Sequence, residues 1–426
     1  MQQQATVAIV GGGLAGFQVA ASLREFGFSG RVVLIGDEPH RPYQRPPLSK
    51  AYLLGAIEEA RLPMRPEAFY QDRRIELMLG KRAVAIDRAH HKLALDDDSV
   101  IAYEHLVLAV GARNRPLPVP GADLDGVFFL RTLDEARALR ARLGSAKSAI
   151  VVGAGFIGLE FAMGARKLGL DVTVIEVADR PMARALSREM SALFMREHAA
   201  SGVRFLLNTQ VMRLIGNAGR VSGVETVEGQ EISGELVLIG IGVIPNVELA
   251  ATCDLELRDG ILVNEQLASA DERISAIGDC AAHPNPYTAD TVRIESVQNA
   301  TDQGRCVAAR IAGRPLPFNF VPWFWSDQGH LKLQIAGIAA GSDRTVVRGD
   351  PGGSSCSVFC YRGGRLLAVE TVNRPADHMA ARRLLGNHVS PTAEQAADES
   401  FDLKRFAAGA GAIGAVTTGA GVPERP

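Results

Sequence analysis

The chain has 426 residues, 47% of them hydrophobic, and its 46 basic and 48 acidic residues leave a formal net charge of −2. This length exceeds what one hydrophobic core usually serves, so we expect more than one domain. The balance of charge argues against a general nucleic-acid binder and a polybasic membrane anchor, so a charged partner must meet a local patch.

Two features predict a cytoplasmic protein. No apolar run approaches the ~18 residues of a membrane span, and the first predicted strand begins too near the N-terminus to leave room for a signal peptide. The five cysteines lack CxxC or metal-ligand spacing, which is typical of structural thiols in a reducing compartment. They are Cys253, Cys280, Cys306, Cys356 and Cys360.

The first predicted strand, residues 6–10, runs into a glycine fingerprint. In such a motif the first glycine permits a tight turn, the second lets the backbone approach a pyrophosphate, and the third lets a helix pack on the strand. A helix over residues 17–26 and a strand over residues 31–35 follow, as the motif requires. The three glycines are Gly11, Gly13 and Gly16.

A polar stretch follows, and residues 41–50 within it are rich in proline. Because proline fixes φ and removes a donor, this stretch predicts a rigid loop that ends at Lys50. The strand-like run 106–110 closes the first block, and the Pro-rich residues 116–121 mark a domain boundary.

A second fingerprint of the same kind follows a strand over residues 149–152 and precedes a further helix and strand. One such motif is weak evidence, but two in full context predict two bound dinucleotides. The glycines of the second motif are Gly153, Gly155 and Gly158.

The residue that ends the second strand of each unit selects the ribose, because a carboxylate accepts hydrogen bonds from ribose hydroxyls and repels a 2′-phosphate. In the second unit this residue is Glu176, which favours NADH over NADPH. Arg180 and Arg184 lie just beyond it; they would hold the adenosine phosphates or allow NADPH, or they are ordinary surface arginines. In the first unit a glycine fills this position, so Asp37 or Glu38 must reach in, and we choose Asp37.

The rest of the chain predicts a return to the first domain and then a new one. A strand over residues 274–277 leads into Asp279, an ending that resembles a return to the first domain. From about residue 321 alternating apolar residues predict an antiparallel sheet. Beyond residue 407 the Gly-, Ala- and Thr-rich sequence predicts a flexible tail. The strand over residues 236–241 ends in the segment Gly240, Ile241 and Gly242, whose small residues would admit a nicotinamide.

These motifs resemble those of the NADH-dependent ferredoxin reductases of the putidaredoxin reductase and biphenyl dioxygenase reductase type, from residue 6 to about 405. One departure is Val110, where the wider superfamily often has threonine. Besides the two fingerprints, the matching segments are residues 35–38, 45–50, 130–134, 278–280, 293–297, 322–327 and 372–375.

The resemblance implies an α/β fold with two Rossmann-like dinucleotide-binding domains, for FAD and NAD, arranged as in glutathione reductase, and a small C-terminal α+β domain. The expected boundaries are 1–116 and 246–320 for a discontinuous FAD domain, 117–245 for the NAD domain, 321–406 for the C-terminal domain and 407–426 for the tail.

The resemblance also assigns site residues. For FAD they are Gly11, Gly13, Ala15 and Gly16 at the pyrophosphate, Asp37 at the adenosine ribose, Lys50 facing the flavin, Ala83 near the adenine, Arg131 at the phosphate or ribityl region, Asp279 at a ribityl hydroxyl, and the Val297 N–H at the flavin pyrimidine edge. For NADH they are Gly153, Gly155, Ile157, Gly158, Glu176, Arg184, Gly240, Ile241 and Gly242.

Three of these assignments have structural alternatives. Asp279 would also suit a Gly-Asp turn, and Ser296 would cap the helix that begins at Val297, a role compatible with the first. Lys50 and Glu160 are the candidate catalytic residues at the nicotinamide–flavin contact, where they would form an ion pair; both are also common surface residues.

The implied reaction passes a hydride from NADH to flavin N5 and then releases electrons singly to an acidic two-iron ferredoxin that serves a haem monooxygenase or a ring-hydroxylating dioxygenase. Trp323 and Trp325 would lie beside the flavin and the acceptor, or pack in the core. A basic docking face would steer the ferredoxin, although the same residues also suit a solvated helix surface. They are Arg61, Arg65, Arg73, Arg74, Arg305, Arg310 and Arg314.

Rival functions fit the sequence less well. A disulfide reductase or a peroxidase-like NADH oxidase needs a cysteine in the first domain, and no cysteine precedes Cys253. A quinone reductase needs a membrane anchor, which the tail does not supply. The remaining alternatives are another NADH oxidoreductase and a signalling flavoprotein resembling apoptosis-inducing factor, which calls for a strongly basic face.

Overall fold

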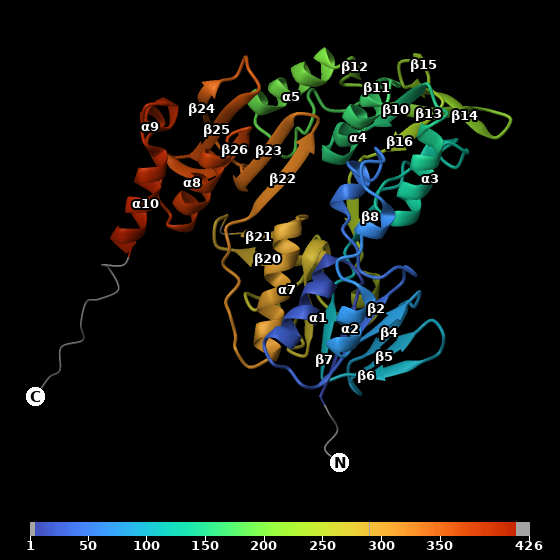
Figure 1. Ribbon diagram of the computed structural model, residues 1–426, viewed down its shortest axis with the longest axis vertical. Coiled ribbons are helices and arrows are strands. Elements are labelled where there is room, and N and C mark those ends of the chain that lie inside the picture. The colour runs from blue at the N-terminus through green and yellow to red at the C-terminus, as the bar shows by residue number, and fades with distance from the viewer. Residues whose placement is uncertain (1–4, 289, 415–426) are drawn as a thin grey trace, which may run out of the picture. The chain divides into compact units, whose positions relative to one another are not determined.

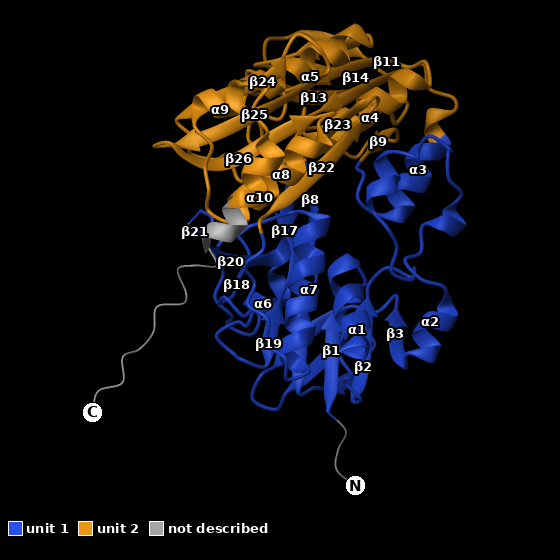
Figure 2. Cartoon of the chain, turned by 60° about the vertical axis from the view of Figure 1, so that its left-hand side comes forward, with its two compact units in different colours: residues 1–116, 129–141, 241–320 blue, residues 117–128, 142–240, 321–426 orange. Residues whose placement is uncertain are grey.

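The computed structural model describes residues 5–288 and 290–414 (Figure 1). The chain divides into two compact units, coloured separately in Figure 2. Unit 1 comprises residues 1–116, 129–141 and 241–320, and unit 2 comprises residues 117–128, 142–240 and 321–426.

Unit 1 is built on a five-stranded parallel sheet in the order β19-β7-β1-β2-β3. Strands β1, β2 and β7 are rich in Val, Ile and Leu, and all three, like β19, are almost wholly buried, as is typical of parallel strands covered on both faces. The sheet strands are β1 (Thr6–Val10), β2 (Arg31–Gly36), β3 (Ile75–Leu79), β7 (His105–Leu108) and β19 (Ile274–Ala276).

Helices α1 (Leu14–Glu25) and α7 (Val297–Ile311) of unit 1 pack closely together. Gly304 allows this approach, since a Cβ there would lie 3.0 Å from the Cβ of Gln18. The other elements of unit 1 are η1 (Pro46–Ser49), η2 (Glu59–Arg61), α2 (Glu67–Asp72), β4 (Ala83–Asp87), β5 (Lys92–Leu95), β6 (Val100–Ala102), β8 (Ala112–Asn114), most of α3 (Leu133–Leu143), β17 (Val243–Pro245), α6 (Glu248–Ala251), β18 (Ile261–Leu262), η3 (Gly278–Cys280), β20 (Ala281–Asn285) and β21 (Asp290–Arg293).

Unit 2 contains a second five-stranded parallel sheet, in the order β12-β11-β10-β16-β9, and a five-stranded antiparallel sheet, in the order β22-β23-β26-β25-β24. The two parallel sheets and the C-terminal antiparallel sheet with its helices confirm the predicted fold class. The elements up to residue 240 are β9 (Val127–Phe128), β10 (Ser148–Val152), α4 (Phe156–Lys167), β11 (Asp171–Ile175), α5 (Arg188–Ala200), β12 (Val203–Leu206), β13 (Val211–Asn217), β14 (Arg220–Thr226), β15 (Glu231–Ser233) and β16 (Val237–Ile239). The C-terminal elements are β22 (Trp323–Gln328), β23 (Leu331–Gly337), β24 (Arg344–Asp350), β25 (Ser355–Arg362), β26 (Arg365–Val372), α8 (Pro375–Gly386), α9 (Ala393–Ala397) and α10 (Leu403–Gly414).

The end of the chain differs from the prediction. Helix α10 continues to Gly414, past residue 407 where the sequence predicts a flexible tail to begin. Leu403 and Ala407 are buried, and α10 packs on α8. The low-complexity sequence does not predict this tertiary contact, which stabilises the helix. The rest of the predicted tail, residues 415–426, lies outside the described residues.

The cysteines are all buried and unbridged, as expected of structural thiols. Burial raises the pKa of Cys280 to about 11, so this thiol stays protonated near neutral pH. Within residues 5–288 and 290–414, no helix is long and apolar enough to cross a membrane.

A buried carboxyl group links the two parts of unit 2. Glu370 of β26 is fully buried, and it accepts hydrogen bonds from the backbone N–H and the hydroxyl of Ser187, the N-cap of α5, at 2.9 and 2.5 Å. Burial raises the pKa of Glu370 to about 7. The folded protein therefore holds a proton that the unfolded chain releases above its ordinary carboxyl pKa of about 4.3.

Because this pKa is raised on folding, the stabilisation is complete below about pH 4 and is lost as the pH rises through 7. The Glu370→Gln variant carries no such titration. We expect the free energy of unfolding of this variant, relative to that of the wild type, to increase by about 3 kcal/mol as the pH rises from 4.5 to 8. Urea midpoints across this pH range measure the difference, with exposed Glu228→Gln as the control; equal pH slopes for wild type and Glu370→Gln would contradict the assignment.

Candidate functional site

The first fingerprint of the sequence forms the turn between β1 and α1. Gly11 has φ +120°, and a Cβ there would lie 2.1 Å from the Ala109 carbonyl oxygen; a Cβ at Gly16 would lie 2.1 Å from the Gly11 carbonyl oxygen. The chain itself therefore fills the space beside the first and third glycines. By contrast, no atom of the described chain lies within 4 Å of the Cβ position of Gly13.

The second fingerprint repeats this geometry between β10 and α4. Gly153 has φ +100°, and a Cβ at Gly158 would lie 2.4 Å from the Gly153 carbonyl oxygen. The middle position, Gly155, is again open: among the described residues its Cβ would meet only the Gly240 carbonyl oxygen, at 3.8 Å.

Each open glycine is also the N-cap of its helix, Gly13 for α1 and Gly155 for α4. A glycine cap has no side chain, so it leaves the first N–H groups of the helix for another acceptor. Helix N-termini of this kind bind phosphate through these N–H groups and the helix dipole. The two turns therefore fit two dinucleotide pyrophosphates.

Asp279 lies beside the first fingerprint. Its neighbour Gly278 has φ +73°, and a Cβ there would lie 3.2 Å from the Cβ of Ala15. The Gly278 N–H donates to the buried side chain of Gln303 on α7 at 2.7 Å, which fixes this turn. Asp279 in turn accepts from Arg131 at 3.0 Å, so the structure brings these two predicted FAD ligands together in unit 1.

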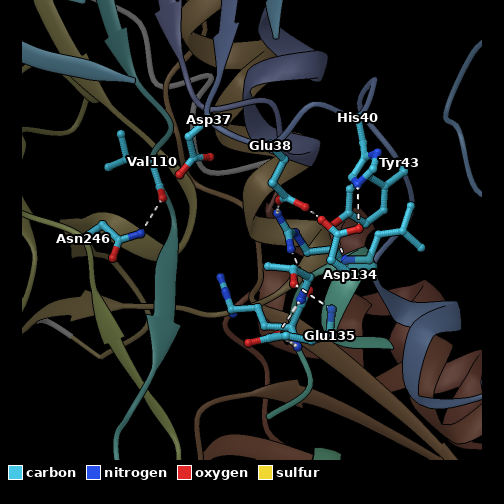
Figure 3. A network of polar contacts seen from close by, with 12 residues as sticks. Asp37, Glu38, His40, Tyr43, Val110, Asp134, Glu135 and Asn246 are labelled. Carbon is cyan, nitrogen blue, oxygen red and sulfur yellow. Dashed lines mark hydrogen bonds and ion pairs between the residues drawn. The ribbon is translucent and has the colours of Figure 1, made fainter. Parts of the chain in front are cut away.

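The ribose position of unit 1 holds two adjacent carboxylates with different surroundings (Figure 3). Glu38 is occupied, because it accepts from the Tyr43 hydroxyl and from Arg45, both at 2.6 Å. Asp37 is 63% exposed and lies 3.9 Å from Arg82, the residue before β4. This arrangement leaves Asp37 as the carboxylate available to a ribose, and Ala83, the first residue of β4, follows Arg82.

The contacts of Glu38 belong to a network that sequence reasoning missed. The Tyr43 hydroxyl accepts from the Leu133 N–H at 2.9 Å, and Arg45 donates to the Arg131 carbonyl oxygen at 2.6 Å. The network ties the Pro-rich loop that ends at Lys50 to the segment carrying Arg131, and burial raises the pKa of Tyr43 so that its hydroxyl keeps its proton. Figure 3 also shows His40, Asp134, Glu135, Val110 and Asn246 around it.

The start of α7 confirms one of the two roles considered for it. The Ser296 hydroxyl accepts from the Asn299 N–H at 3.0 Å, which confirms Ser296 as the N-cap. Val297 is the first residue of the helix, so its N–H is at the positive end of the helix dipole. Its contact with a flavin stays a prediction.

Glu176 follows β11 and lies against the second fingerprint. Its carboxylate accepts from the N–H groups of Ala154 and Ala178 at 2.7 and 2.9 Å. Arg180 is held by Asp179 at 3.0 Å and by a backbone carbonyl, which favours a structural role for it. Arg184 is exposed.

The remaining residues predicted for NADH are divided between the units. In unit 2, Gly240 lies beside the second fingerprint, since its Cβ would be 3.6 Å from Gly158 Cα, and Ile157 is exposed at the start of α4. Ile241 and Gly242 begin the last segment of unit 1. Gly242 is exposed, with φ +97°.

The two candidate catalytic residues are placed differently. Glu160 is buried on α4, two residues after Gly158, and accepts from the Ser326 hydroxyl at 2.6 Å. Lys50 follows η1 in unit 1 and is half-buried. Since Glu160 belongs to unit 2, the ion pair between them stays a prediction.

The tryptophans do not pack in the core, which was one of the two predicted roles. Trp323 and Trp325 are only half-buried and contact each other, with 5.4 Å between ring centroids and 35° between the ring planes. The Arg382 guanidinium lies 4.9 Å from the Trp323 ring, so this aromatic pair carries a positive group on its face.

The predicted docking arginines separate in the structure. Arg65 and Arg73 both lie over the Phe69 ring at 5.6 Å. The prediction for Arg310 is wrong: this side chain donates to the Ser275 hydroxyl at 2.5 Å and anchors α7 to the sheet. The exposed members of the group are Arg61, Arg65, Arg73, Arg74, Arg305 and Arg314.

Two open helix N-termini behind parallel sheets, each with a carboxylate near the end of the second strand, define a two-dinucleotide oxidoreductase. Residues 5–304 match the family described as pyridine nucleotide-disulphide oxidoreductase, and residues 323–407 match the one described as reductase C-terminal. The chain belongs to the pyridine nucleotide-disulphide oxidoreductase family, within its ferredoxin reductase branch, and its cofactors are FAD and a nicotinamide dinucleotide.

The similar proteins support this placement. Rhodocoxin reductase of Rhodococcus erythropolis is 53% identical over 399 residues, which cover 94% of this chain and 93% of that protein. The ferredoxin reductase for the CYP199A2 system from Rhodopseudomonas palustris is 51% identical, with a TM-score of 0.92 over 94% of this chain and 99% of that one. The covalent putidaredoxin reductase–putidaredoxin complex matches at 38% identity with a TM-score of 0.93, covering 96% of this chain and 99% of that one.

Proposed function

We propose that this chain is an FAD-dependent NADH:ferredoxin oxidoreductase of the cytoplasm. It takes a hydride from NADH onto flavin N5 and delivers electrons singly to a two-iron ferredoxin, which serves a haem monooxygenase or a ring-hydroxylating dioxygenase. The observation that carries the proposal is the pair of glycine N-caps, Gly13 and Gly155, each with open space that would admit a pyrophosphate. The names of the relatives, which include ferredoxin reductases and a reductase bound to putidaredoxin, support the acceptor.

The protein's part in this chemistry is binding and orientation, while bound FAD supplies the conversion of a two-electron donor into one-electron steps. In unit 1, Asp37 would bind the adenosine ribose and Arg131 with Asp279 would bind the ribityl and phosphate region. The Val297 N–H would face the flavin pyrimidine edge, where a fixed dipole stabilises negative charge. Glu160 and Lys50 would position the nicotinamide.

The cysteines argue against a redox-active disulfide in this chain. Cys280, next to Asp279, is fully buried and its raised pKa of about 11 keeps it from forming the thiolate that disulfide exchange requires. An acidic ferredoxin would dock on the exposed arginines of unit 1, among them Arg65 and Arg73 beside Phe69 and Arg305 on α7.

Anaerobic stopped-flow absorbance tests the proposal. We expect NADH to bleach the bound flavin within seconds. A two-iron ferredoxin should then reoxidise the flavin at a rate that falls with added salt. Flavin that NADH bleaches but ferredoxins fail to reoxidise would indicate another NADH oxidoreductase. Slow bleaching that leaves a persistent charge-transfer complex would favour a binding role such as that of a signalling flavoprotein.

Glu176 provides a prediction for nucleotide preference. Its carboxylate repels a 2′-phosphate and accepts from ribose hydroxyls, and charged hydrogen bonds contribute about 1.5–3 kcal/mol each. We expect Glu176→Ala to lower the ratio of kcat/KM for NADH to that for NADPH on the order of 100-fold. Ferricyanide reduction with each nucleotide measures this ratio, with exposed Glu228→Ala as control. An unchanged ratio would remove Glu176 from the ribose site.

A further inference from the structure

A chain of four buried polar side chains crosses unit 2. His198 of α5, Gln328 and Ser326 of β22, and Glu160 of α4 are each at least 95% buried. The His198 Nε2 lies 2.7 Å from Gln328 Oε1, Gln328 Nε2 lies 3.1 Å from Ser326 Oγ, and Ser326 Oγ lies 2.6 Å from Glu160 Oε1. These three hydrogen bonds thus join the C-terminal sheet to the helix that carries the second fingerprint.

Each hydrogen bond in this series is donated in the same direction, from His198 towards Glu160. The Gln328 amide nitrogen faces Ser326 and the Met182 sulfur, so its oxygen faces His198, which must donate from Nε2. Burial lowers the pKa of His198, so its ring is neutral and has one proton to give. Since Ser326 accepts from Gln328, its own hydroxyl hydrogen goes to the Glu160 carboxylate. Hydrogen bonds aligned in one direction polarise each other, and the last of them acts on a charged acceptor.

Packing holds the same two elements together. The rings of Phe156, at the start of α4, and Phe324 of β22 lie 4.5 Å apart, centroid to centroid. Ser326 is two residues along β22 from Phe324 and therefore points to the same face of the strand. The strand places its hydroxyl against α4 just beyond the fingerprint, at a position set by both the aromatic contact and the β-pairing of Ser326 with Leu333.

We propose that Ser326 is a positioning residue for hydride transfer: through the chain His198–Gln328–Ser326 the C-terminal sheet fixes the carboxylate of Glu160 at the nicotinamide site. This inference rests on the proposed function, because it is NADH oxidation that Glu160 serves. It assigns to the C-terminal domain a part in the reaction with NADH, in addition to any part in the reaction with the electron acceptor.

A double-mutant cycle on flavin-loaded protein tests the proposal. We expect Ser326→Ala to slow the limiting rate of flavin bleaching by NADH about tenfold, the effect of one hydrogen bond to a charged group. Reoxidation by ferricyanide should stay unchanged, and Ser326→Thr, which keeps the hydroxyl, should recover most of the rate. In the Glu160→Gln background the same Ser326→Ala change should have little further effect, because Ser326 acts through Glu160.

The control is Ser357→Ala, which removes an equally buried serine that donates to the Asp377 carboxylate at 2.7 Å in the same unit. Calorimetric NAD⁺ affinity and urea midpoints on all variants give readouts without turnover. If Ser326→Ala lowers the midpoint as Ser357→Ala does but leaves the bleaching rate and the NAD⁺ affinity at their wild-type values, Ser326 is structural and the proposal is overturned. A further loss of rate in the Glu160→Gln background equally overturns it. Wild-type flavin that NADH does not bleach would instead reject the proposed function itself, and the proposal with it.

Discussion

Replacing Gly13 with valine is expected to give a folded but colourless protein. Gly13 has extended backbone angles, φ −78° and ψ −172°, that any residue adopts, and no atom of the described chain lies within 4 Å of its Cβ position. A valine side chain therefore enters space that the fold does not use. If that space belongs to the FAD pyrophosphate, the side chain separates the phosphates from the N–H groups of α1.

The size of the effect follows from those hydrogen bonds. Losing two charged hydrogen bonds, at about 1.5–3 kcal/mol each, weakens FAD binding by on the order of 100-fold or more. Flavin absorbance at constant protein concentration, before and after reconstitution with FAD, measures the occupancy, and far-UV circular dichroism checks the fold.

The matched control is Gly144→Val, since Gly144 likewise has no atom of the described chain within 4 Å of its Cβ position and lies outside both fingerprints. This variant should stay yellow. A yellow Gly13→Val protein with wild-type flavin content would show that the first fingerprint does not hold FAD.

The sequence predicted these turns well because their signal is local. A tight turn, an open N-cap and a helix packed on a strand each require glycine within one six-residue segment, and the structure uses Gly11, Gly13 and Gly16 in these three ways. The choice of Asp37 over Glu38 stays a prediction, but the structure gives a reason for it that the sequence did not: Glu38 accepts hydrogen bonds from Tyr43 and Arg45.

What the sequence did not predict depends on contacts between distant segments. Ser326 and Glu160 are 166 residues apart, and Ser187 and Glu370 are 183 apart. Local periodicity predicts that a strand has a buried face, but it does not specify which helix covers that face. One signal was nevertheless present: Ser326 and Gln328 alternate along β22, so two polar residues share one buried face and require polar partners.

Arg310 shows the opposite error, because a charge counted on a helix in the sequence was taken for a surface charge. Its side chain is directed to the Ser275 hydroxyl and to the Glu272 carbonyl oxygen. By contrast, Arg305, five residues earlier on α7, and Arg314, beyond the end of this helix, are exposed. A basic residue in a helix therefore belongs to a docking surface only when the structure shows that its side chain is exposed and not bonded within the fold.

Replacing Gly155 with valine should weaken the binding of NADH and leave the binding of FAD unchanged. This glycine has the same extended angles as Gly13, and within the described chain its Cβ would meet only the Gly240 carbonyl oxygen at 3.8 Å, an ordinary contact distance. We therefore expect a folded, yellow protein with full FAD content. Its NADH affinity, however, should fall by on the order of 100-fold, because the valine excludes the second pyrophosphate from the N-terminus of α4.

The concentration of NADH that gives half the limiting bleaching rate measures this loss, and dithionite supplies a reductant that needs no nucleotide site. Dithionite should reduce the Gly155→Val flavin as completely as that of the wild type, and ferredoxin should reoxidise it at the wild-type rate, because the FAD site of unit 1 is unchanged. Loss of flavin from this variant would mean that the two fingerprints are not assigned to separate cofactors. Wild-type affinity for NADH would mean that the second fingerprint binds no nucleotide.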